Sequence, residues 1–549
     1  MKNKPVYDFK KFSSIREMMN MALTEAPDKI AYEFKGKDGN IVYITYKEFC
    51  NTVENLGAAI TELGFGSSHI ACLGDNSYDW IVAYLTVLQS ASVFVPLDRE
   101  LPEKDIVHLI CDSESEVVFY SKRFEKMLQE KQSELPFVKY FIGFDRTEDD
   151  GKFLSFGNLI KKGQTLDKTE YDSLKSDEYD MKMLCYTSGT TGMSKGVMLT
   201  EHNLVSSVYY GVQVSQIYER GLSVLPYNHT YESVCDILVT IYFHSTLCIN
   251  DSLKAVLKNM QLYKPSHIYL VPAFSEIFYT NILFTIKNKG KYKQFCKLVK
   301  LSNALLKVGI DLRGVFFKQL RDAFGGNLRK IVCGGAPIRP EIGEFFGDLG
   351  IALTGGYGIT ECSPLVSVNN EKKSNNYNTA GSRLACLDWR IDSPNEEGIG
   401  EICVKGDVVM KGYYKQPDKT AEVLRDGWFY TGDYGYITKD DQIVITGRKK
   451  NIIVLNNGKN IYPEEIENYI MRVDYITEAV VKGIKNEHGQ DIGLLAEVYI
   501  DKEEFRNPDN VLKDVQATLQ TLPIYKNVKK IIIRKEPFEK TTSNKIKRS

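Results

Sequence analysis

The chain has 549 residues, with 70 basic and 71 acidic side chains, a formal net charge of -1 and 43% hydrophobic residues. This length exceeds one ordinary hydrophobic core and predicts at least two domains. The balanced charge argues against a general nucleic-acid binder, so no nucleic-acid partner is expected. Eleven cysteines stand at irregular spacings without a Cys-x-x-Cys pair. That pattern disfavours a zinc site and a disulfide framework, and it is typical of scattered buried thiols.

The first residues, 1–6, are basic, but no apolar stretch of signal-peptide length follows them. The most apolar long stretch, Trp80 to Val95, is interrupted by Gln89 and Ser90. It is also shorter than the roughly 20 residues that span a bilayer. We predict a core helix that leads into a strand, and a cytoplasmic protein.

Helical and strand-like stretches alternate up to about residue 340. The helices are expected at 15–23 and 47–63, and the strands at 117–120, 183–186, 268–271 and 330–333. This alternation predicts an α/β fold, with parallel sheets flanked by helices in a large N-terminal domain. Short strands with glycine turns predict a small β-barrel or distorted sheet at about 375–446. A small α+β C-terminal domain is predicted at 447–549, after an N-terminal domain at 1–446.

Residues 283–323 form a long stretch with helical periodicity and many basic side chains. One interpretation is a solvated helical face that covers a core. The other is a basic amphipathic surface that contacts an anionic membrane, which would place the protein peripherally at the inner face of that membrane.

A glycine- and hydroxyl-rich segment, 186–196, follows the predicted strand at 183–186. Glycines let backbone N–H groups face an anion, hydroxyls add donors and a lysine adds positive charge. Lys195 is followed by glycine, so this is not the Gly-Lys-Ser/Thr loop of P-loop ATPases. The predicted phosphate-binding residues here are Thr187, Ser188, Gly189, Thr190, Thr191, Gly192 and Lys195.

Four further motifs follow in order, at 334–337, 355–361, 430–433 and 447–450, and a last one stands at 541–546. Together with the glycine-rich segment they resemble the adenylate-forming superfamily of acyl-CoA synthetases, luciferases and peptide-synthetase adenylation domains. The resemblance spans essentially the whole chain. The run at 229–232, the basic segment and the residues after Gly447 are most similar to bacterial long-chain fatty acid–CoA ligases.

The resemblance implies a two-step reaction. A carboxylate attacks the α-phosphate of ATP and expels pyrophosphate, and the acyl group then passes from AMP to the thiol of CoA. The acid is anionic near neutral pH, so the first step depends on positioning and charge neutralisation rather than on a base. A medium- to long-chain fatty acid is the expected substrate. The alternatives are an enzyme that loads a separate acyl carrier protein, a ligase for aryl or other acids, and a binder without activity.

The resemblance also assigns roles around the phosphates. Glu361, with Thr187 adding a hydroxyl oxygen, is expected to hold Mg²⁺, a hard cation that prefers oxygen ligands. Thr360 is expected to hydrogen-bond the α-phosphate. His229 would line the route from the acyl site to the adenylate, although a lone histidine is more often a packed or hydrogen-bonded residue.

The nucleoside contacts are implied in the same way. Tyr357 would stack on adenine, and Gly356 and Gly358 would keep the backbone close to the ring. Asp433 resembles the aspartate that accepts both ribose hydroxyls, and Arg448 would add a ribose or phosphate contact. The wall of the adenine pocket is expected to comprise Gly335, Ala336 and Pro337.

The C-terminal motifs imply a mobile domain. Lys545 resembles the late lysine that bridges the acid and the α-phosphate, although it follows Asn544 where the family has glycine. Lys450 stands at the expected hinge, and Gly458 and Lys459 would face the CoA thiol after the domain rotates.

Overall fold

The computed structural model describes residues 6–187, 194–372, 375–456, 459–487, 489–500, 507–540 and 546–548. The chain divides into two compact units. The first contains residues 1–388 and 405–427, and the second contains residues 389–404 and 428–549. The predicted boundary near Gly447 falls inside the second unit, and the mobility of residues 447–549 stays a prediction.

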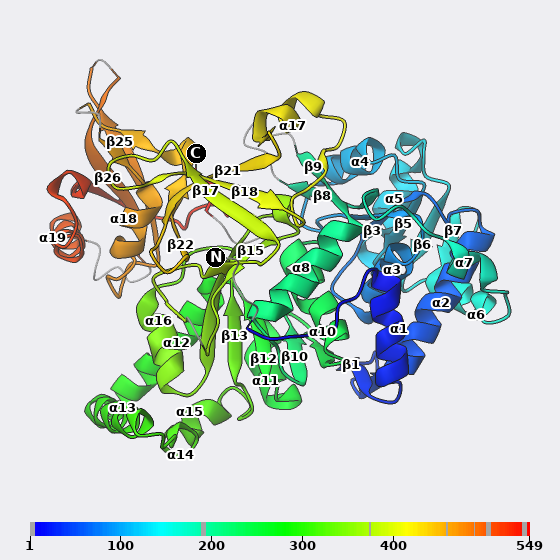
Figure 1. The fold of residues 1–549 in the computed structure, drawn as a ribbon, viewed down its shortest axis with the longest axis horizontal. Coiled ribbons are helices and arrows are strands. Elements are labelled where there is room, and N and C mark those ends of the chain that lie inside the picture. Colours follow the sequence, from blue (N-terminus) through cyan, green and yellow to red (C-terminus); the bar gives the residue numbers. More distant parts are fainter. Residues whose placement is uncertain are drawn as a thin grey trace. The chain divides into compact units, whose positions relative to one another are not determined.

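A mixed sheet of nine strands supports one half of the first unit (Figure 1). The six strands from β14 to β1 run parallel, as the alternation of helices and strands predicted. In spatial order the strands are β16 (Ser382–Arg383), β15 (Leu365–Val368), β14 (Ala352–Gly358), β13 (Lys330–Cys333), β12 (His267–Leu270), β10 (Arg220–Ser223), β11 (Thr246–Ile249), β1 (Ile30–Lys35) and β2 (Ile41–Thr45).

A second sheet of eight strands supports the other half of this unit. Its strands are β19 (Gly412–Tyr413), β9 (Lys195–Thr200), β8 (Met181–Thr187), β4 (Val93–Pro96), β3 (His69–Leu73), β5 (Val117–Tyr120), β6 (Tyr140–Gly143) and β7 (Phe153–Ser155). The strands from β8 to β7 are parallel, whereas β9 and β19 are added antiparallel at one edge. This edge carries predicted phosphate-binding residues.

Helices stand at the expected positions: α1 (Ile15–Glu25), α2 (Tyr46–Glu62) and α3 (Tyr78–Leu88). The helices α2 and α3 pack against strands of these sheets, and α1 packs against α2. A capping box between Thr45 and Glu48 starts α2. All residues of α3 from Trp80 to Leu88 are buried. The Trp80 ring contacts Phe94 of one sheet and Tyr227, which follows a strand of the other. The predicted core helix that leads into a strand is therefore confirmed.

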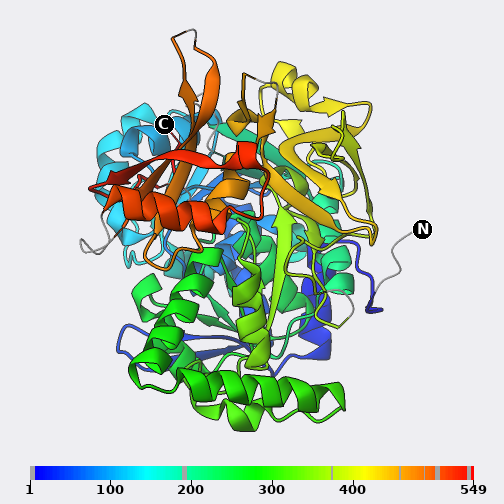
Figure 2. The same ribbon diagram turned by 90° about the vertical axis from the view of Figure 1, so that its left-hand side faces the viewer.

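The basic stretch at 283–323 is helical but interrupted. It comprises the end of α12 (Pro272–Asn288), α13 (Tyr292–Lys307), α14 (Arg313–Phe316) and α15 (Lys318–Asp322), which lie together at one end of the first unit in both views (Figures 1 and 2). Gly290 and Gly309 adopt positive φ just after α12 and α13. Left-handed residues of this kind end helices, which explains the breaks.

The second unit contains two antiparallel pairs that share β21 (Trp428–Ile437): β21 with β22 (Ile443–Arg448), and β21 with the part of β18 (Gly400–Gly406) up to residue 404. A three-stranded sheet follows, with β25 (Glu478–Lys485), β26 (Asp491–Tyr499) and β27 (Val528–Arg534). The helices α18 (Pro463–Ile470) and α19 (Pro508–Thr518) cover this sheet, and all three elements contribute to one apolar core. The α+β character predicted for the C-terminal region is confirmed.

All eleven cysteines are free thiols, and eight are buried. Among the described residues, no helix combines the length and hydropathy needed to cross a bilayer. The free and mostly buried cysteines agree with the expectation of scattered buried thiols.

Candidate active site

Two of the predicted phosphate-site residues meet at a tyrosine. The Tyr413 hydroxyl donates a hydrogen bond of 2.9 Å to Oε1 of Glu361. The Nζ atom of Lys195 lies 4.8 Å from the centre of the Tyr413 ring, within the range of a cation–π contact. Burial and the neighbouring Glu361 carboxylate raise the pKa of Tyr413, so its hydroxyl remains a donor. A cation, a phenol and a carboxylate are thus grouped in one unit.

The strand pairing explains why these side chains meet. Thr187 ends β8 and pairs with Lys195, which begins β9. Tyr413 of β19 pairs with Val197 of β9, and the backbone N–H of Met410 donates to the Glu361 carbonyl. Thr187 and Lys195, which flank the glycine-rich segment, therefore lie at the same edge of the first unit as Glu361.

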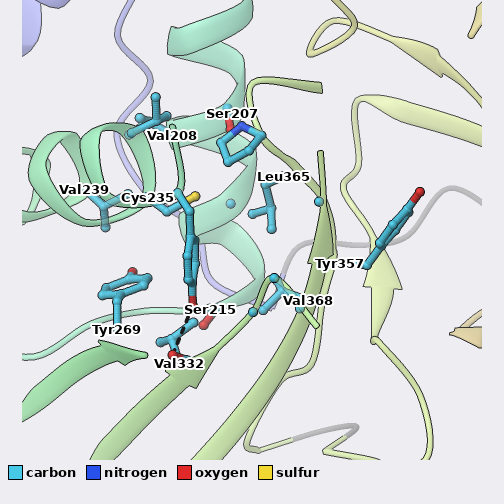
Figure 3. Close-up of a pocket in the computed structure, with 18 of the residues that line it drawn as sticks. Ser207, Val208, Ser215, Cys235, Val239, Tyr269, Val332, Tyr357, Leu365 and Val368 are labelled. Carbon is cyan, nitrogen blue, oxygen red and sulfur yellow. Dashed lines mark hydrogen bonds between the residues drawn. The ribbon is translucent and has the colours of Figure 1, made fainter. Parts of the chain in front are cut away.

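An apolar cavity of about 100 Å³ lies next to the predicted nucleotide wall (Figure 3). One side is α8 (Glu201–Val214), which begins with a capping box at Thr200 and Asn203. The opposite sides are β13, β14 and a π-helix, Ser233–Leu238. The side chains of the lining residues are mostly apolar and include Val208, Val212, Val234, Val239, Val332, Leu365 and Val368. The cavity suits an apolar group.

Four glycines join this cavity to the predicted adenine wall. Gly334, Gly335, Gly356 and Gly358 line the cavity, and all lie at the carboxyl ends of parallel strands or directly after them. Thr360 and Glu361 follow in the 3₁₀ turn Thr360–Cys362. Gly335 has a φ of +87° and, like Ala336 and Pro337, is exposed. A group that enters from this edge would pass the predicted nucleotide site first.

Tyr357 borders the cavity, but its side chain does not enter it (Figure 3). It is 8% exposed, and its side chain points away from the cavity (Figure 3). Stacking of its ring on adenine stays a prediction.

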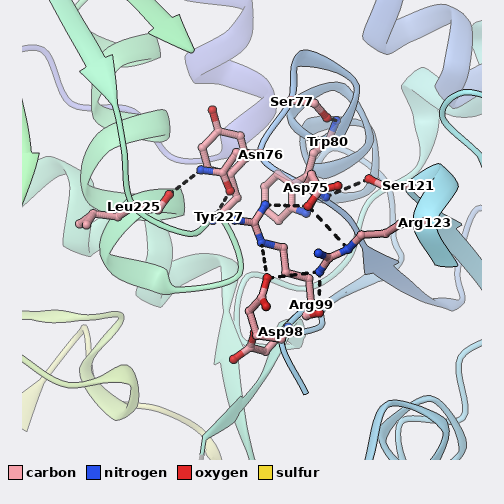
Figure 4. A network of polar contacts seen from close by, with 11 residues as sticks. Asp75, Asn76, Ser77, Trp80, Asp98, Arg99, Ser121, Arg123, Leu225 and Tyr227 are labelled. Atoms are coloured by element: carbon pink, nitrogen blue, oxygen red, sulfur yellow. Dashed lines mark hydrogen bonds and ion pairs between the residues drawn. The ribbon is translucent and has the colours of Figure 1, made fainter. Parts of the chain in front are cut away.

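His229 stands at the start of the short helix Thr230–Glu232, in a loop that other side chains hold. Asn76 donates from Nδ2 to the Leu225 carbonyl at 2.7 Å and accepts from the Tyr227 N–H at 3.1 Å (Figure 4). Glu232 accepts from the Val224 N–H at 3.1 Å. The loop that carries His229 is therefore fixed at both ends, but its contact with an adenylate stays a prediction.

Charged groups surround the turn before α3 (Figure 4). Arg99 pairs with Asp75 at 2.8 Å, and Arg123 donates to the Arg99 carbonyl at 2.6 Å. The Ser121 hydroxyl accepts from the Asp75 N–H at 2.9 Å. These contacts hold the turn that carries both Asp75 and Asn76, and so they support the loop that Asn76 contacts.

Two buried acids lie behind the cavity wall. Burial raises the pKa of Glu232 well above its ordinary value, and it raises that of Asp236 to about 8. His267, fully buried, lies 4.0 Å from Asp236, and burial lowers its pKa to about 3. All three groups are therefore neutral near pH 7 because the interior disfavours charge.

The second unit brings together two predicted ribose residues. Nε of Arg448 in β22 lies 2.7 Å from Oδ1 of Asp433 in β21, and the two residues are paired across the strands. Asp433 is 3% exposed, whereas almost half of the Arg448 side chain is exposed. Gly432 precedes the aspartate with a φ of +71°, and a Cβ atom built on it would meet no neighbouring atom.

The hinge and thiol-channel predictions also fall in this unit. Lys450 lies in the 3₁₀ turn Lys449–Asn451 after β22, and burial and Arg448 lower its pKa. Nζ of Lys459 lies 5.8 Å from the Tyr525 ring centre. Predictions for Ser188, Gly189, Thr190, Thr191, Gly192, Gly458 and Lys545 lie outside the described residues.

Comparison with known proteins decides the family. The AMP-binding enzyme family matches residues 20–414. The chain belongs to this family. Long chain acyl-CoA synthetase 3 of Arabidopsis thaliana is 28% identical over 82% of this chain and 72% of its own length. The long-chain-fatty-acid–CoA ligase FadD15 of Mycobacterium tuberculosis is 29% identical over 83% and 78%, respectively.

Solved structures show the same fold for this AMP-binding enzyme. The anthranilate CoA ligase AuaEII, in complex with anthranoyl-AMP, has a TM-score of 0.78 at 17% identity and covers 98% of this chain and 96% of its own. A Mycobacterium tuberculosis fatty acyl CoA synthetase has a TM-score of 0.67 at 21% identity, with 97% and 96% covered. The predicted architecture, with parallel sheets flanked by helices, is confirmed.

The residues of this AMP-binding enzyme fit an Mg²⁺ ion that is held jointly by the protein and the substrate phosphates. Within the described part of the chain, no group of three His, Cys, Asp or Glu side chains could enclose a metal. Mg²⁺ usually binds through one or two carboxylates and substrate phosphates, and it keeps several waters. Glu361, oriented by Tyr413, supplies such a carboxylate.

Tyr413 lies outside the motifs that mark the site in the sequence. A two-residue strand gave no pattern to identify, and the tyrosine stands 52 positions after its carboxylate partner.

Proposed function

We propose that the protein activates a medium- to long-chain fatty acid with ATP, forming acyl-AMP and pyrophosphate, and then transfers the acyl group to CoA. The observation that carries this proposal is the shared glycine lining: Gly334, Gly335, Gly356 and Gly358 border both the apolar cavity and the predicted nucleotide wall. A carboxylate at the mouth of the cavity would lie beside the nucleotide while its chain occupied the cavity. The long-chain acyl-CoA ligases among the relatives support the same substrate class.

The first step needs an anionic acid, an α-phosphate and a means to reduce repulsion between them. Lys195 contributes a positive charge, and Glu361 would hold Mg²⁺ against the phosphates. When bound, that ion neutralises charge on the leaving pyrophosphate. Tyr413 fixes one carboxylate oxygen of Glu361 and leaves the other to bind. Because the nucleophile is already ionised, no residue has to remove a proton.

The second step joins a thiol to the acyl carbon and expels AMP. The bond from the carbonyl carbon to the phosphate oxygen breaks as the carbon–sulfur bond forms, and the thiol proton is released. Lys450 and Lys459 of the second unit are our candidates for the hinge and the thiol side, and Lys545 is our candidate for the first step. An acyl carrier protein as the acceptor is the alternative.

A panel of acids tests this function. Pyrophosphate and thioester are measured with short, medium and long alkyl acids and with aryl acids, each with and without CoA. Medium or long alkyl acids should give pyrophosphate, and CoA should convert them into thioesters. Thioester formed with a carrier protein but not with CoA would contradict CoA as the acceptor. A preference for aryl acids would contradict a fatty acid as the substrate.

We also propose that α12 and α13 contact an anionic membrane at its cytoplasmic face. Between Glu276 and Asp311 the sequence contains seven lysines and no acidic residue. Large apolar side chains on the same helices are exposed, including Phe284 at 59% and Leu301 at 50%. Exposed apolar groups among lysines suit a surface of anionic lipid, where each lysine adds about 1 kcal/mol.

Vesicle sedimentation tests this contact. The protein should bind vesicles that contain phosphatidylserine and not vesicles of phosphatidylcholine alone, and high salt should release it. Substitution of both Phe284 and Leu301 by serine should reduce binding, whereas Ile532→Ser, an exposed apolar residue of the second unit, should not. Equal binding to both vesicle types, or none at low salt, would contradict the proposal.

A further inference from the structure

The cavity has a polar end. Ser215, the C-terminal cap of α8, lines the cavity at the end where β13 begins, because its neighbour Lys330 is the first residue of that strand. The predicted nucleotide wall lies at the other end of the same strands, around Gly334 and Gly358. A chain that enters beside the nucleotide would therefore reach Ser215 last.

A buried ammonium sets the orientation of the Ser215 hydroxyl. The side chain of Lys330 is 0% exposed, and its Nζ lies 2.7 Å from Oγ of Ser215. The same Nζ donates to the Gln216 carbonyl and to Oε2 of Glu371, both at 2.9 Å. An ammonium has three protons, and all three are used here. Ser215 must therefore accept from Lys330, and its own proton remains for another acceptor.

No such acceptor for the Ser215 hydroxyl lies within hydrogen-bonding distance among the described residues. The hydroxyl borders a cavity whose other walls are mostly apolar. Ser215 is half-buried, and an alkyl end packed over its hydroxyl would shield the donor from water and leave it unsatisfied. This position therefore favours a ligand that brings its own oxygen. A carboxylate would instead add a buried negative charge close to Glu371, whose charge is already balanced by Lys330.

We propose that the preferred substrate is an acid with a neutral oxygen, such as a hydroxyl or carbonyl group, at the end remote from the reacting carboxylate. Ser215 donates a hydrogen bond to this oxygen, and Lys330 positions Ser215. The inference rests on the proposed function, because it assumes that the acyl chain occupies the cavity. It adds a distinct specificity residue, about 12 Å along α8 from Ser207, which lines the other end.

The test compares matched acids of equal length: alkyl, ω-hydroxy and α,ω-dicarboxylic. The ratio of kcat/KM values is measured by pyrophosphate release over a series of lengths. At the length that reaches Ser215, the ω-hydroxy acid should be preferred about five- to tenfold over the alkyl acid, as expected for one hydrogen bond. The dicarboxylic acid should be the poorest substrate.

Three variants separate specificity from structure. Ser215→Ala should bring the ratio of ω-hydroxy to alkyl acid to about one, Ser215→Thr should restore the preference, and Ser207→Ala should keep it. Equal losses for both acids in Ser215→Ala, or no preference at any length in the wild-type protein, would overturn the inference while the ligase function stood. Failure of every acid to release pyrophosphate would instead overturn the proposed function, and the inference with it.

Discussion

The hydroxyl of Tyr413 and the carboxylate of Glu361 are joined by a hydrogen bond of 2.9 Å. This contact links a residue of an edge strand to the predicted magnesium ligand, and the Tyr413 ring also lies beside Lys195. The Tyr413 phenol thus contacts both the Glu361 carboxylate and the Lys195 ammonium of the predicted phosphate site.

Tyr413→Phe should weaken the use of Mg²⁺. Without the hydroxyl, the Glu361 carboxylate loses an orienting partner, and groups that orient a metal ligand typically contribute about 10- to 100-fold in affinity or activity. The Mg²⁺ concentration for half-maximal pyrophosphate release should therefore rise. Tyr414→Phe, at the adjacent position with its hydroxyl near Glu114, is the control. An unchanged Mg²⁺ dependence in Tyr413→Phe would show that the contact does not position the ligand.

Gly211→Ile should shorten the accepted acyl chain. Gly211, in the last turn of α8, lines the cavity between Ser207 and Ser215, and a Cβ atom there would lie 3.1 Å from Cδ2 of Leu365. The added side chain would occupy space that a long chain needs, so the ratio of kcat/KM for long to short acids should fall by at least about tenfold. Gly157→Ile, at an exposed helical position, should leave the ratio unchanged. An equal fall in kcat/KM for acids of every chain length in Gly211→Ile would argue against acyl binding in this cavity.

Asp236→Asn should flatten the loss of stability between about pH 4 and 8. The pKa of Asp236 is about 8 in the folded protein and 3.8 in the reference state, so the fold retains a proton that the unfolded chain releases. This contribution is complete below pH 4 and disappears as the pH rises through 8. Its slope is at most about 1.4 kcal/mol per pH unit. Asparagine does not titrate, so the variant should lose less stability over this range.

Urea unfolding between pH 6.5 and 8 measures this effect best. His267 opposes it only at lower pH, because its lowered pKa makes stability increase from about pH 3 to 6.5. Asp150→Asn, an exposed acid, should keep the wild-type slope. The same slope in Asp236→Asn and the wild-type protein would mean that Asp236 is ionised in the fold.

Arg448→Ala should raise the KM for ATP more than it lowers kcat. Arg448 is paired with Asp433 at 2.7 Å, and its loss would leave a nearly buried carboxylate without that cation. A nucleotide would then bind less well, by roughly tenfold for one charge-assisted contact. Arg425→Ala, an exposed arginine of the first unit, is the control. A change in kcat with no change in KM would contradict a role in nucleotide binding.

The local parts of the candidate site could be predicted because glycine-rich motifs are local. The glycines after the predicted strand at 330–333 and the motif at 355–361 predicted the nucleotide wall, and Lys195 and Glu361 were proposed from their own motifs. The sequence did not identify Tyr413 or the polar end of the cavity. These depend on contacts between distant positions, such as Lys330 with Ser215, which no local pattern encodes.

The basic stretch at 283–323 shows the same limit of prediction from sequence, here for the fold. The periodicity of 283–323 predicted helix correctly, but it did not predict the breaks. Gly290 and Gly309 were visible in the sequence, yet a glycine within a helical pattern can be tolerated or can end the helix. Only the positive φ angles decide between the two.

Formation of acyl-AMP in the absence of CoA tests the central claim most directly. Wild-type protein incubated with ATP, Mg²⁺ and a medium- or long-chain fatty acid should yield acyl-AMP that mass spectrometry detects, and Glu361→Gln should lower the yield by at least about 100-fold. Absence of acyl-AMP from the wild-type protein with every acid, or an equal yield from Glu361→Gln, would contradict the account.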